Sequence, residues 1–566
     1  ENNITGGVYI HDCPLIQVKE NVFKNNGSGA EVLYSKECVI SKNNFEGNQK
    51  GLFLRSPNCV LTENKFSENR YNLGISGLHA TPDYFLHQID PSNTINEKPI
   101  YYLVNKENET IPANASYVGI VNSKKIKIEG LTLENNWENI LVFNSEEIVI
   151  QKNKIKNSFV GILLSNSRNG EISQNLIEAN AIGIYLRDIT NQFKIFENKI
   201  QRNQSPVHGT GIMMFDSFNN QIFKNEFSFN QKAIKILYRG SRENKIFQNL
   251  FFKNEWALVM TDCTLNEIFE NLFFSNQLAL FWPVLDPPFK NKYYKNIFFS
   301  SFFIIPGGNS IFLNNFISQP SVDVHLNPDV SADTHSPEEL EYTFEGVQRK
   351  SYLGNYYLDY QGKDENKDGI GDTFFYSRYN QLIDKYPLLS WWQSYFAKEQ
   401  WKFEQNFQYQ INNKTFSATS SGFVFLLEKT DFRPQILQIG GEVLFENSSF
   451  WQNAENVKIY LVVTDSFNRQ KEIFELPKEK IFFDNVIENS KPVPNKYYFF
   501  TEIENPPIPK NYGHYEVYLE INGKPFFQNT NSRINPHYLP LTQLPKNFPP
   551  IPQIKFSPKN PVKGVK

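Results

Sequence analysis

Soft metal donors and long apolar runs are what this chain has least of. Its 566 residues include four Cys, three Met and eight scattered His, which argues against a copper site built from neighbouring soft ligands. No run of 18 apolar residues occurs, so no transmembrane segment is expected. Lys and Arg (57) nearly balance Asp and Glu (60), and without a basic excess we expect no nucleic-acid partner.

Helical stretches rich in Ala, Leu and Glu are also missing. Phe (50), Tyr (28) and Asn recur instead, which favours strands and tight turns. A chain of 566 residues is too long for one ordinary core. A repeat protein avoids this limit because each repeat buries its apolar face only against its neighbours.

A repeat is the strongest pattern in the sequence. The phrase Asn-x-apolar-x-x-Asn precedes a Gly or Ala and an alternating apolar strand, as in GILL at 161 and GIYL at 183. Copies lie mostly 21 to 25 residues apart and begin at Asn21, Asn43, Asn64, Asn175, Asn198, Asn225, Asn249 and Asn271, with weaker copies at Asn153, Asn296 and Asn314. This predicts the coils of a parallel β-helix with alternate apolar residues inside. Asn suits a left-handed bend and can bond to the Asn above and below it.

Competing repeat folds fit less well. A leucine-rich repeat has a similar period but needs a helical return, and a β-propeller needs blades about twice as long. Residues 70 to about 120 break the period and predict either an insertion or a set of widened coils. Long loops on a rigid scaffold often carry function.

Cysteines recur at one place in the repeat. Cys13, Cys38 and Cys59 occupy equivalent positions in successive copies, and Cys263 has a similar context. We interpret them as small buried hydrophobic residues, with a disulfide as the alternative.

The repeats end near residue 330, and an acidic loop follows at residues 364–372. Its spacing, Asp-x-Asn-x-Asp-Gly-x-x-Asp, places oxygen ligands at loop positions one, three, five and nine, and Gly369 permits the sharp turn. Phe375 stands where an EF-hand has Glu, so a further ligand would come from Asp359, Asp384 or water. We expect one Ca²⁺, held by Asp364, Asn366, Asp368, the carbonyl of Ile370, and Asp372.

This loop also carries a family resemblance. The stretch NYYLDYQGKDENKDGIGDTFFY, followed by DKYPLL, resembles the terminal signature of the β-helix family named for the nitrous-oxide-reductase accessory protein NosD. The segment HQIDPSNTINEKPIYYLVNKENETIPANAS resembles one common in archaeal surface members of that family. The resemblance covers residues 1 to about 395. It implies a right-handed parallel β-helix of the carbohydrate-binding and sugar-hydrolase type, exported from the cytoplasm.

The expected fold class is all-β throughout. The solenoid would occupy residues 1–330, and its terminal region with the calcium loop residues 331–396. Short alternating strands such as GFVFLLEK and NVKIYLVVTDS then predict an immunoglobulin-like or fibronectin-like β-sandwich over 397–545. In residues 546–566 a Pro-rich linker precedes IKFSPKNPVKGVK, which resembles the first strand of a polycystic-kidney-disease-type (PKD) module.

A column of carboxylates is the candidate catalytic site. Aligning the strands puts Asp188, Asp216 and Asp262 at one place in nearby coils, where stacked acids can form an acid/base pair. They could equally cap backbone amides at turns. The candidates for sugar binding in the same stretch are Tyr185, Tyr238, Arg239, Trp256 and Trp282.

An apolar stripe is also expected on the outer face of these strands. It contains Phe53, Leu141, Leu163, Tyr185, Met213, Val259 and Phe281. The C-terminal domain, the insertion or a partner would have to cover it.

Together these patterns favour an extracellular cell-surface protein, stabilised by Ca²⁺, with a structural, adhesive or carbohydrate-binding role. The expected partners are a cell-envelope glycan or other surface-protein subunits, including further copies of the chain. The alternative is a polysaccharide lyase, hydrolase or epimerase that uses acids on the β-helix face.

Overall fold

The computed structural model describes most of the first 396 residues and the strand backbone beyond them. The described residues are 6–76, 82–205, 208–274, 276–281, 290–299, 302–303, 309–316, 333–357, 360–377, 383–390 and 392–396, with strands between 406 and 534. The chain forms two compact units, residues 1–400 and residues 401–566.

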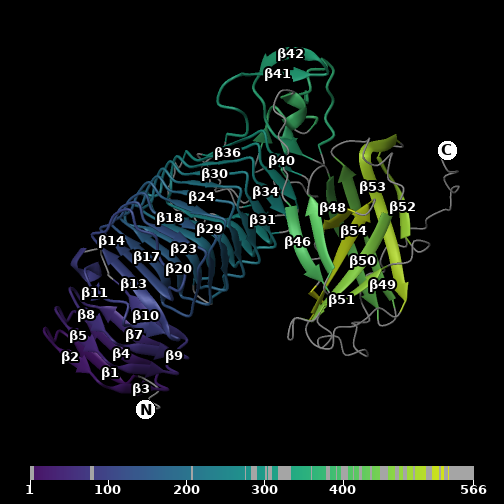
Figure 1. The fold of residues 1–566 in the computed structure, drawn as a ribbon. Helices are drawn as coiled ribbons and strands as arrows, with labels where there is room; N and C mark the ends of the chain where they lie inside the picture. Colours follow the sequence, from purple (N-terminus) through teal and green to yellow (C-terminus); the bar gives the residue numbers. More distant parts are fainter. Residues whose placement is uncertain are drawn as a thin grey trace, which may run out of the picture. The chain divides into compact units, whose positions relative to one another are not determined.

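The first unit begins with a solenoid segment of three parallel sheets (Figure 1). Each strand pairs with its equivalent one coil further on, as Val8 does with Ala30. One sheet contains β1 (Val8–His11), β4 (Ser28–Leu33), β7 (Lys50–Arg55) and β10 (Tyr71–Ile75). The second contains β2 (Gln17–Lys19), β5 (Val39–Ser41), β8 (Val60–Thr62) and β11 (Gln88–Ile89). The third begins with β3 (Val22–Lys24), β6 (Asn44–Glu46), β9 (Lys65–Ser67) and β12 (Thr94–Ile95).

The solenoid changes phase where the repeat is interrupted. After η1 (Pro82–Phe85), β11 and β12 complete a coil of the first segment. β13 (Lys98–Val104) then runs antiparallel to β12 and pairs in parallel with β14 (Tyr117–Val121). The third sheet of the first segment therefore continues as the first sheet of a second segment, and the described part of the interruption consists of widened coils.

The shared 14-stranded sheet is called the long sheet below. Its later strands are β17 (Glu138–Phe143), β20 (Val160–Ser165), β23 (Ile182–Arg187), β26 (Thr210–Phe215), β29 (Lys232–Leu237), β32 (Trp256–Thr261), β35 (Leu278–Phe281) and β38 (Phe302–Phe303). A nine-stranded sheet contains β15 (Lys127–Glu129), β18 (Val149–Gln151), β21 (Glu171–Ser173), β24 (Lys194–Phe196), β27 (Gln221–Phe223), β30 (Lys245–Phe247), β33 (Glu267–Phe269), β36 (Lys292–Tyr294) and β39 (Ser310–Phe312). A ten-stranded sheet contains β16 (Thr132–Glu134), β19 (Lys154–Lys156), β22 (Leu176–Glu178), β25 (Lys199–Gln201), β28 (Glu226–Ser228), β31 (Leu250–Phe252), β34 (Leu272–Phe274), β37 (Ile297–Phe299), β40 (Asn315–Phe316) and β43 (Tyr356–Tyr357). The predicted parallel β-helix is confirmed.

The core consists of inward columns that repeat from coil to coil. In the ten-stranded sheet the inner residue changes from Ile to Phe along the solenoid. Phe227, Phe251, Phe273 and Phe298 stack there with ring centroids 4.6 to 5.0 Å apart. All four side chains are buried, as the alternation predicts.

The repeated Asn residues form the predicted ladder. The Nδ2 of Asn249 donates to the carbonyls of Ile222 and Phe247 and to Asn271 Oδ1, and its Oδ1 accepts from the backbone and side-chain nitrogens of Asn225. The expected left-handed backbone at these Asn residues is wrong. The positive φ belongs to the preceding residue, here Gln248 at 54°. That residue makes the bend, and the buried Asn side chain that follows it bonds to its neighbours.

A terminal region ends the ladder. Asn314 bonds to Asn355, whose two nitrogens donate to Oδ2 of Asp384. Asp384 is fully buried and also accepts from the Tyr357 hydroxyl and the Tyr386 amide, and burial raises its pKa to about 6. These bonds engage both oxygens of Asp384 at the end of the ladder, and its role as an extra calcium ligand stays a prediction. Asp359 lies outside the described residues.

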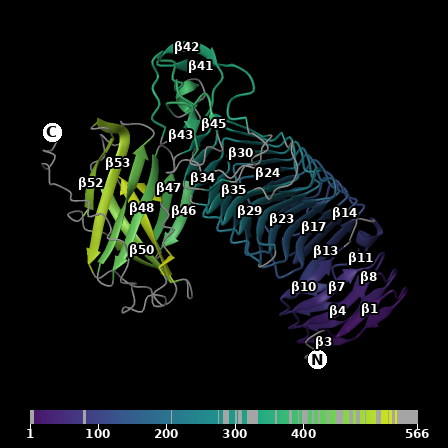
Figure 2. The same ribbon diagram turned by 180° about the vertical axis from the view of Figure 1, so that it is seen from behind.

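The remaining elements of this region are short. They are β41 (Leu340–Phe344), β42 (Val347–Ser351), β44 (Phe375–Tyr376), β45 (Ile383–Asp384) and η2 (Trp392–Tyr395). β41 and β42 form an antiparallel hairpin that stands out from the solenoid in Figure 2.

The second unit consists of antiparallel strands. β46 (Asn406–Ile411) pairs with β47 (Lys414–Thr419). One sheet has the order β48 (Phe423–Arg433), β49 (Ile436–Phe445), β53 (Lys491–Glu504) and β52 (Ile481–Glu488). The other has the order β51 (Lys471–Glu475), β50 (Val457–Asp465), β54 (Gly513–Ile521) and β55 (Lys524–Phe527), with β56 (Arg533–Ile534) on β54. These strands bear out the all-β class, while the immunoglobulin-like assignment stays a prediction. The predicted PKD-type start lies outside the described residues.

Helices play almost no part in the described fold. The two described helices, η1 and η2, are four-residue 3₁₀ turns. Within the described residues, no helix has the length and hydrophobicity needed to span a bilayer.

The widened coils cover part of the predicted outer stripe. Leu141 and Leu163 are buried in one hydrophobic cluster with Phe85 and Tyr102 from these coils. The Phe85 ring stacks on Phe143 with centroids 4.2 Å apart. The sequence left open whether the C-terminal domain, the insertion or a partner covers the stripe. For Leu141 and Leu163 it is the insertion.

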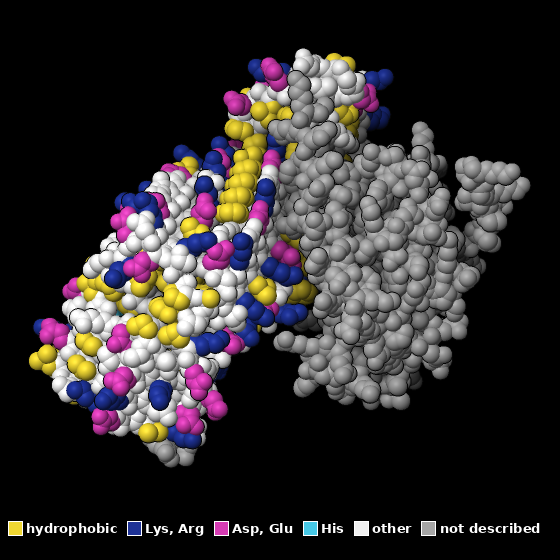
Figure 3. Space-filling model, in the orientation of Figure 1, with side chains coloured by type: hydrophobic (Ala, Val, Ile, Leu, Met, Phe, Trp, Pro, Cys, Tyr) yellow, Lys and Arg dark blue, Asp and Glu magenta, His cyan; other side chains and the backbone are white. Residues whose placement is uncertain are grey.

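A second outer column lies on the nine-stranded sheet and was not predicted. Its rings stack at 5.0 to 5.3 Å and belong to Phe196, Phe223, Phe247, Phe269, Tyr294 and Phe312. Figure 3 shows a column of hydrophobic surface, bordered by charged side chains, along the upper part of the solenoid. Because the rings stack on one another, this column stabilises the coils it connects.

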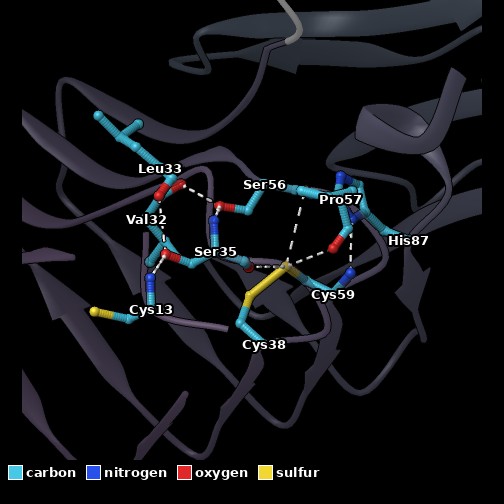
Figure 4. The surroundings of a disulfide bond; sticks show 9 residues. All are labelled: Cys13, Val32, Leu33, Ser35, Cys38, Ser56, Pro57, Cys59 and His87. Atoms are coloured by element: carbon cyan, nitrogen blue, oxygen red, sulfur yellow. Dashed lines mark hydrogen bonds between the residues drawn. A yellow bond between two sulfur atoms is a disulfide. The ribbon is translucent and has the colours of Figure 1, made fainter. Parts of the chain in front are cut away.

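The cysteine prediction is corrected in part. Cys38 and Cys59 form a disulfide between adjacent coils, with a Cα–Cα distance of 4.6 Å (Figure 4). The parallel register of β5 and β8 brings these residues within disulfide range. Cys13 is a free, exposed thiol, whereas Cys263 is buried as expected.

Candidate functional site

A cleft of about 660 Å³ lies where the two solenoid segments meet, within the size range of ligand pockets. One wall belongs to the bends before β7 and β10, and the other to bends of the second segment. The side chains on the first wall include Gln49, Glu68, Arg70 and Tyr71, and those on the second include Asn135, Trp137, Asn157, Phe159 and Gln204.

Backbone hydrogen bonds hold the two walls together. The backbone and side-chain nitrogens of Asn72 donate to the Asn135 carbonyl at 2.7 and 2.8 Å. The Trp137 amide donates to the Leu73 carbonyl at 2.9 Å. A Cβ on Gly74 would lie 2.7 Å from the Cβ of Trp137, so only glycine permits this approach. These backbone contacts fix the positions of the two walls, and so the shape of the cleft.

Aromatic rings form the apolar part of the cleft. The half-buried Trp137 ring stacks on Phe159 with centroids 4.4 Å apart and meets the edge of Tyr71 at 5.6 Å. Phe53 supports it at 5.2 Å, and the Lys50 ammonium lies 5.3 Å from its centroid. Such rings pack well against the apolar face of a sugar.

Polar side chains surround these rings without partners of their own. Within the described residues, the side chains of Gln49, Glu68 and Asn157 make no hydrogen bond or ion pair, and Arg70 contacts only the face of Tyr71, at 5.4 Å. They offer both donors and acceptors, which a hydroxyl-rich ligand needs. Glu68 is the one carboxylate on the described cleft wall, whereas glycoside hydrolysis ordinarily requires two.

Glu138 lies behind the cleft, next to Trp137 in the chain. Its buried carboxylate accepts hydrogen bonds from the Ile75 amide at 2.6 Å and the Tyr117 hydroxyl at 2.7 Å. Burial raises the pKa of Glu138 to about 8, against the weaker effect of these donors. The carboxyl is thus mainly neutral at pH 7 and links β10 to β17.

The predicted carboxylate column has its expected register. Asp188, Asp216 and Asp262 each follow the last residue of a long-sheet strand, and their φ angles are 51°, 49° and 51°. The same left-handed position in preceding coils belongs to Asn122, Asn144 and Asn166, whose amides bond to one another. The Asp residues thus continue a column of turn residues.

The predicted sugar-binding residues that the structure describes lie on this face and not in the cleft. Burial raises the pKa of Tyr185, which also experiences the charges of Arg187, Asp188 and Asp216. Tyr238 is exposed and packs on Phe215 at 4.5 Å, and Arg239 is also exposed. Trp256 lies under the Lys232 ammonium at 5.0 Å. Trp282 lies outside the described residues.

The predicted calcium loop is compact. The two carboxylate oxygens of Asp364 accept from the amides of Asp368 and Gly369 at 3.0 and 2.9 Å, and Asp368 accepts from the Ile370 amide at 2.7 Å. Asp372 accepts from the Glu365 amide at 2.6 Å. Gly369 has a φ of 86°, as the sharp turn requires.

The donors of the loop fit calcium chemically. All predicted ligands, including the Asn366 side chain and the Ile370 carbonyl, are oxygens, and each carboxylate keeps lone pairs beyond its amide bonds. Among the described residues no group of three or more His, Cys, Asp or Glu is arranged around a metal position. Binding would therefore require the loop side chains to turn inward.

Comparison with known proteins supports the fold. The model described as "Right handed beta helix region" matches residues 1–83, and that described as "Periplasmic copper-binding protein (NosD)" matches residues 89–281. The boundary between them lies within the interruption of the repeat, a few residues before the phase change between β12 and β13. The two matches and the described solenoid support a NosD-type parallel β-helix protein.

Solved structures resemble this NosD-type chain only distantly. The periplasmic alginate epimerase AlgG is 15% identical, with a TM-score of 0.30 over 54% of this chain and 76% of its own. The A-module of the Azotobacter vinelandii mannuronan C-5 epimerase AlgE6 is 10% identical, with a TM-score of 0.24 over 49% and 85%. The Dettilon tailspike protein is 10% identical, with a TM-score of 0.25 over 89% and 86%. No curated protein matches the chain.

The copper in the family description does not fit the described donors of this NosD-type solenoid. Met214, Met260 and Cys263 are buried in the hydrophobic core, and Cys38 and Cys59 are joined in a disulfide. Within the described residues these side chains offer no cluster of soft ligands to a copper ion.

Sequence reasoning missed the cleft because its walls come from coils that are distant in the chain. Tyr71 and Trp137 meet only because the solenoid changes phase between them. The available signal was the pair Trp137 and Phe159, large aromatic residues in a bend where the following coils carry Ala181, Gly209, Gln231 and Glu255.

Proposed function

We propose that this chain is a glycan-binding β-helix of an extracellular or cell-surface protein, and that the cleft at the segment junction is its binding site. The observation that carries the proposal is the half-buried Trp137, flanked by Tyr71 and Phe159 and faced by polar side chains without partners. The partner would be a cell-envelope glycan, held without catalysis, so the role is adhesive or structural.

Trp137→Ala is expected to abolish most of this binding. Removal of a central aromatic contact typically costs 2 kcal/mol or more, which weakens affinity by about 30-fold. Ligands would be found on a glycan array and their affinities measured by calorimetry. Tyr238→Ala, on the exposed Tyr of the other face, is the matched control and should bind normally. Equal affinity in wild type and Trp137→Ala would refute the cleft as the site.

Calcium would stabilise the terminal region in this proposal. Binding to the folded state alone stabilises by about 2.7 kcal/mol when free Ca²⁺ is a hundred times its dissociation constant. Chelation should therefore lower the melting temperature and expose the loop to proteolysis near Lys363 and Lys367. Asp368→Ala should melt at the lower temperature with or without chelator. If the melting temperature of the wild type changes with neither Ca²⁺ nor chelator, the calcium assignment is wrong.

An enzyme acting on polysaccharides is the second candidate. It is favoured by the gathering of Tyr185, Asp188 and Asp216 on the outer face of the long sheet. Turnover of a polysaccharide that is lost in Asp216→Asn and kept in Trp137→Ala would establish this alternative in place of the first.

A further inference from the structure

Two lysines interrupt apolar columns on the outer face of the long sheet. The register aligns Lys232 with Thr210 and Trp256. It aligns Lys235 with Met213 and Val259, in the column that begins with Leu141 and Leu163. An apolar side chain would match the column of Lys235, which lies between Met213 and Val259.

Neither lysine is neutralised within the described residues. Lys232 is 9% exposed and Lys235 is half-buried, yet no carboxylate lies within ion-pair distance of either. The Lys232 ammonium lies over the Trp256 ring at 5.0 Å. Burial lowers the pKa of both, and Lys235 lowers that of Lys232 further, while Glu255 opposes this from a distance.

His208 connects the two lysines to the cleft. The Lys232 amide donates to the carbonyl of Gly209, the next residue to His208, at 2.8 Å. The His208 ring meets the edge of Phe159 at 5.3 Å, and Phe159 lines the cleft. Burial, and then Lys235 and Lys232, lower the pKa of His208. Two lysines without an ion-pair partner among the described residues, and a histidine whose ring can donate a hydrogen bond, thus lie beside the cleft.

Half-buried like charges destabilise a fold unless a counter-charge is bound. We propose that Lys232, Lys235 and His208 form an anion site for a carboxylate group of an acidic glycan whose neighbouring sugar lies in the cleft. This inference rests on the proposed glycan binding and adds the class of ligand. Uronic-acid residues supply such a carboxylate at the spacing of a sugar chain.

The test compares an oligogalacturonate with its methyl ester, which lacks the negative charge and carries an added methyl group on each carboxyl. Wild type should bind the acid form at least about ten-fold more tightly, the effect of one charge-assisted hydrogen bond, and salt should reduce the difference. Lys235→Met should abolish the preference, leave binding of the ester unchanged and raise the melting temperature, because an apolar residue then fills an apolar column. Lys235→Arg should keep the preference, and Lys194→Met, on the nine-stranded sheet, should change neither property.

The remaining outcomes separate the two proposals. Equal affinity for acid and ester in wild type, or an acid preference that survives in Lys235→Met, overturns the anion site and leaves glycan binding in place. If the protein captures only uncharged glycans from the array, the anion site is likewise wrong and glycan binding stays in place. If no glycan binds at all, both proposals are wrong.

Discussion

Asn249→Ala is expected to lower the free energy of unfolding of the solenoid by about 4 kcal/mol, because several buried polar groups lose their partners at once. The side-chain Nδ2 of Asn249 donates to the carbonyls of Ile222 and Phe247 and to the next Asn of the ladder. Its Oδ1 accepts from the backbone and side-chain nitrogens of Asn225. An alanine leaves these groups buried and unsatisfied. Denaturant unfolding of purified variants measures the loss.

The position of the effect is also predicted. Coils of a solenoid contact only their neighbours, so amide exchange should accelerate first in the coils that contain Asn225, Asn249 and Asn271. Lys245→Ala, on the exposed side of the same coil, should change stability by less than about 0.5 kcal/mol. If Asn249→Ala is no more destabilising than Lys245→Ala, the ladder does not have the role given to it here.

The second large effect concerns pH and Glu138. Its pKa of about 8 in the folded protein, against about 4.5 when unfolded, means that the folded state holds a proton that the unfolded state releases. The stabilisation is fully present below pH 4.5 and is lost as pH rises through about 8, a change on the order of 4 to 5 kcal/mol.

Glu138→Gln should remove this pH dependence. The amide oxygen can still accept from the Ile75 amide and the Tyr117 hydroxyl, but the side chain cannot ionise. Asp384, with a pKa of about 6, and His87, lowered to about 4 by burial, also titrate, and both remain in the variant. The difference between wild type and Glu138→Gln across pH 6.5 to 9 therefore isolates Glu138. Parallel stability curves over that range would contradict the buried, protonated state.

Much of the solenoid could be predicted from sequence because its rules are local. A period near 22 residues, alternation within strands and a recurring Asn specify inner and outer faces coil by coil. The same regularity placed Asp188, Asp216 and Asp262 in one column correctly. It could not say what they do, since a turn Asp and a catalytic Asp have the same spacing.

The features missed depend on breaks in the pattern. The phase change after β12 brings Tyr71 beside Trp137, and no periodicity extends across it. The disulfide depended on whether stacked thiols at Cys38 and Cys59 are oxidised, which spacing alone leaves open. The left-handed bend was assigned one residue too late, because Asn is often left-handed but here bonds to its neighbours instead.

The central claim is that the junction cleft binds a glycan, and a crystal structure of the protein with an array-selected oligosaccharide tests it most directly. We predict a sugar ring packed against Trp137 between Tyr71 and Phe159, with hydroxyls bonded to Gln49, Arg70 or Asn157. An oligosaccharide bound along Asp188, Asp216 and Asp262, with the cleft empty, would contradict the account and favour an enzyme.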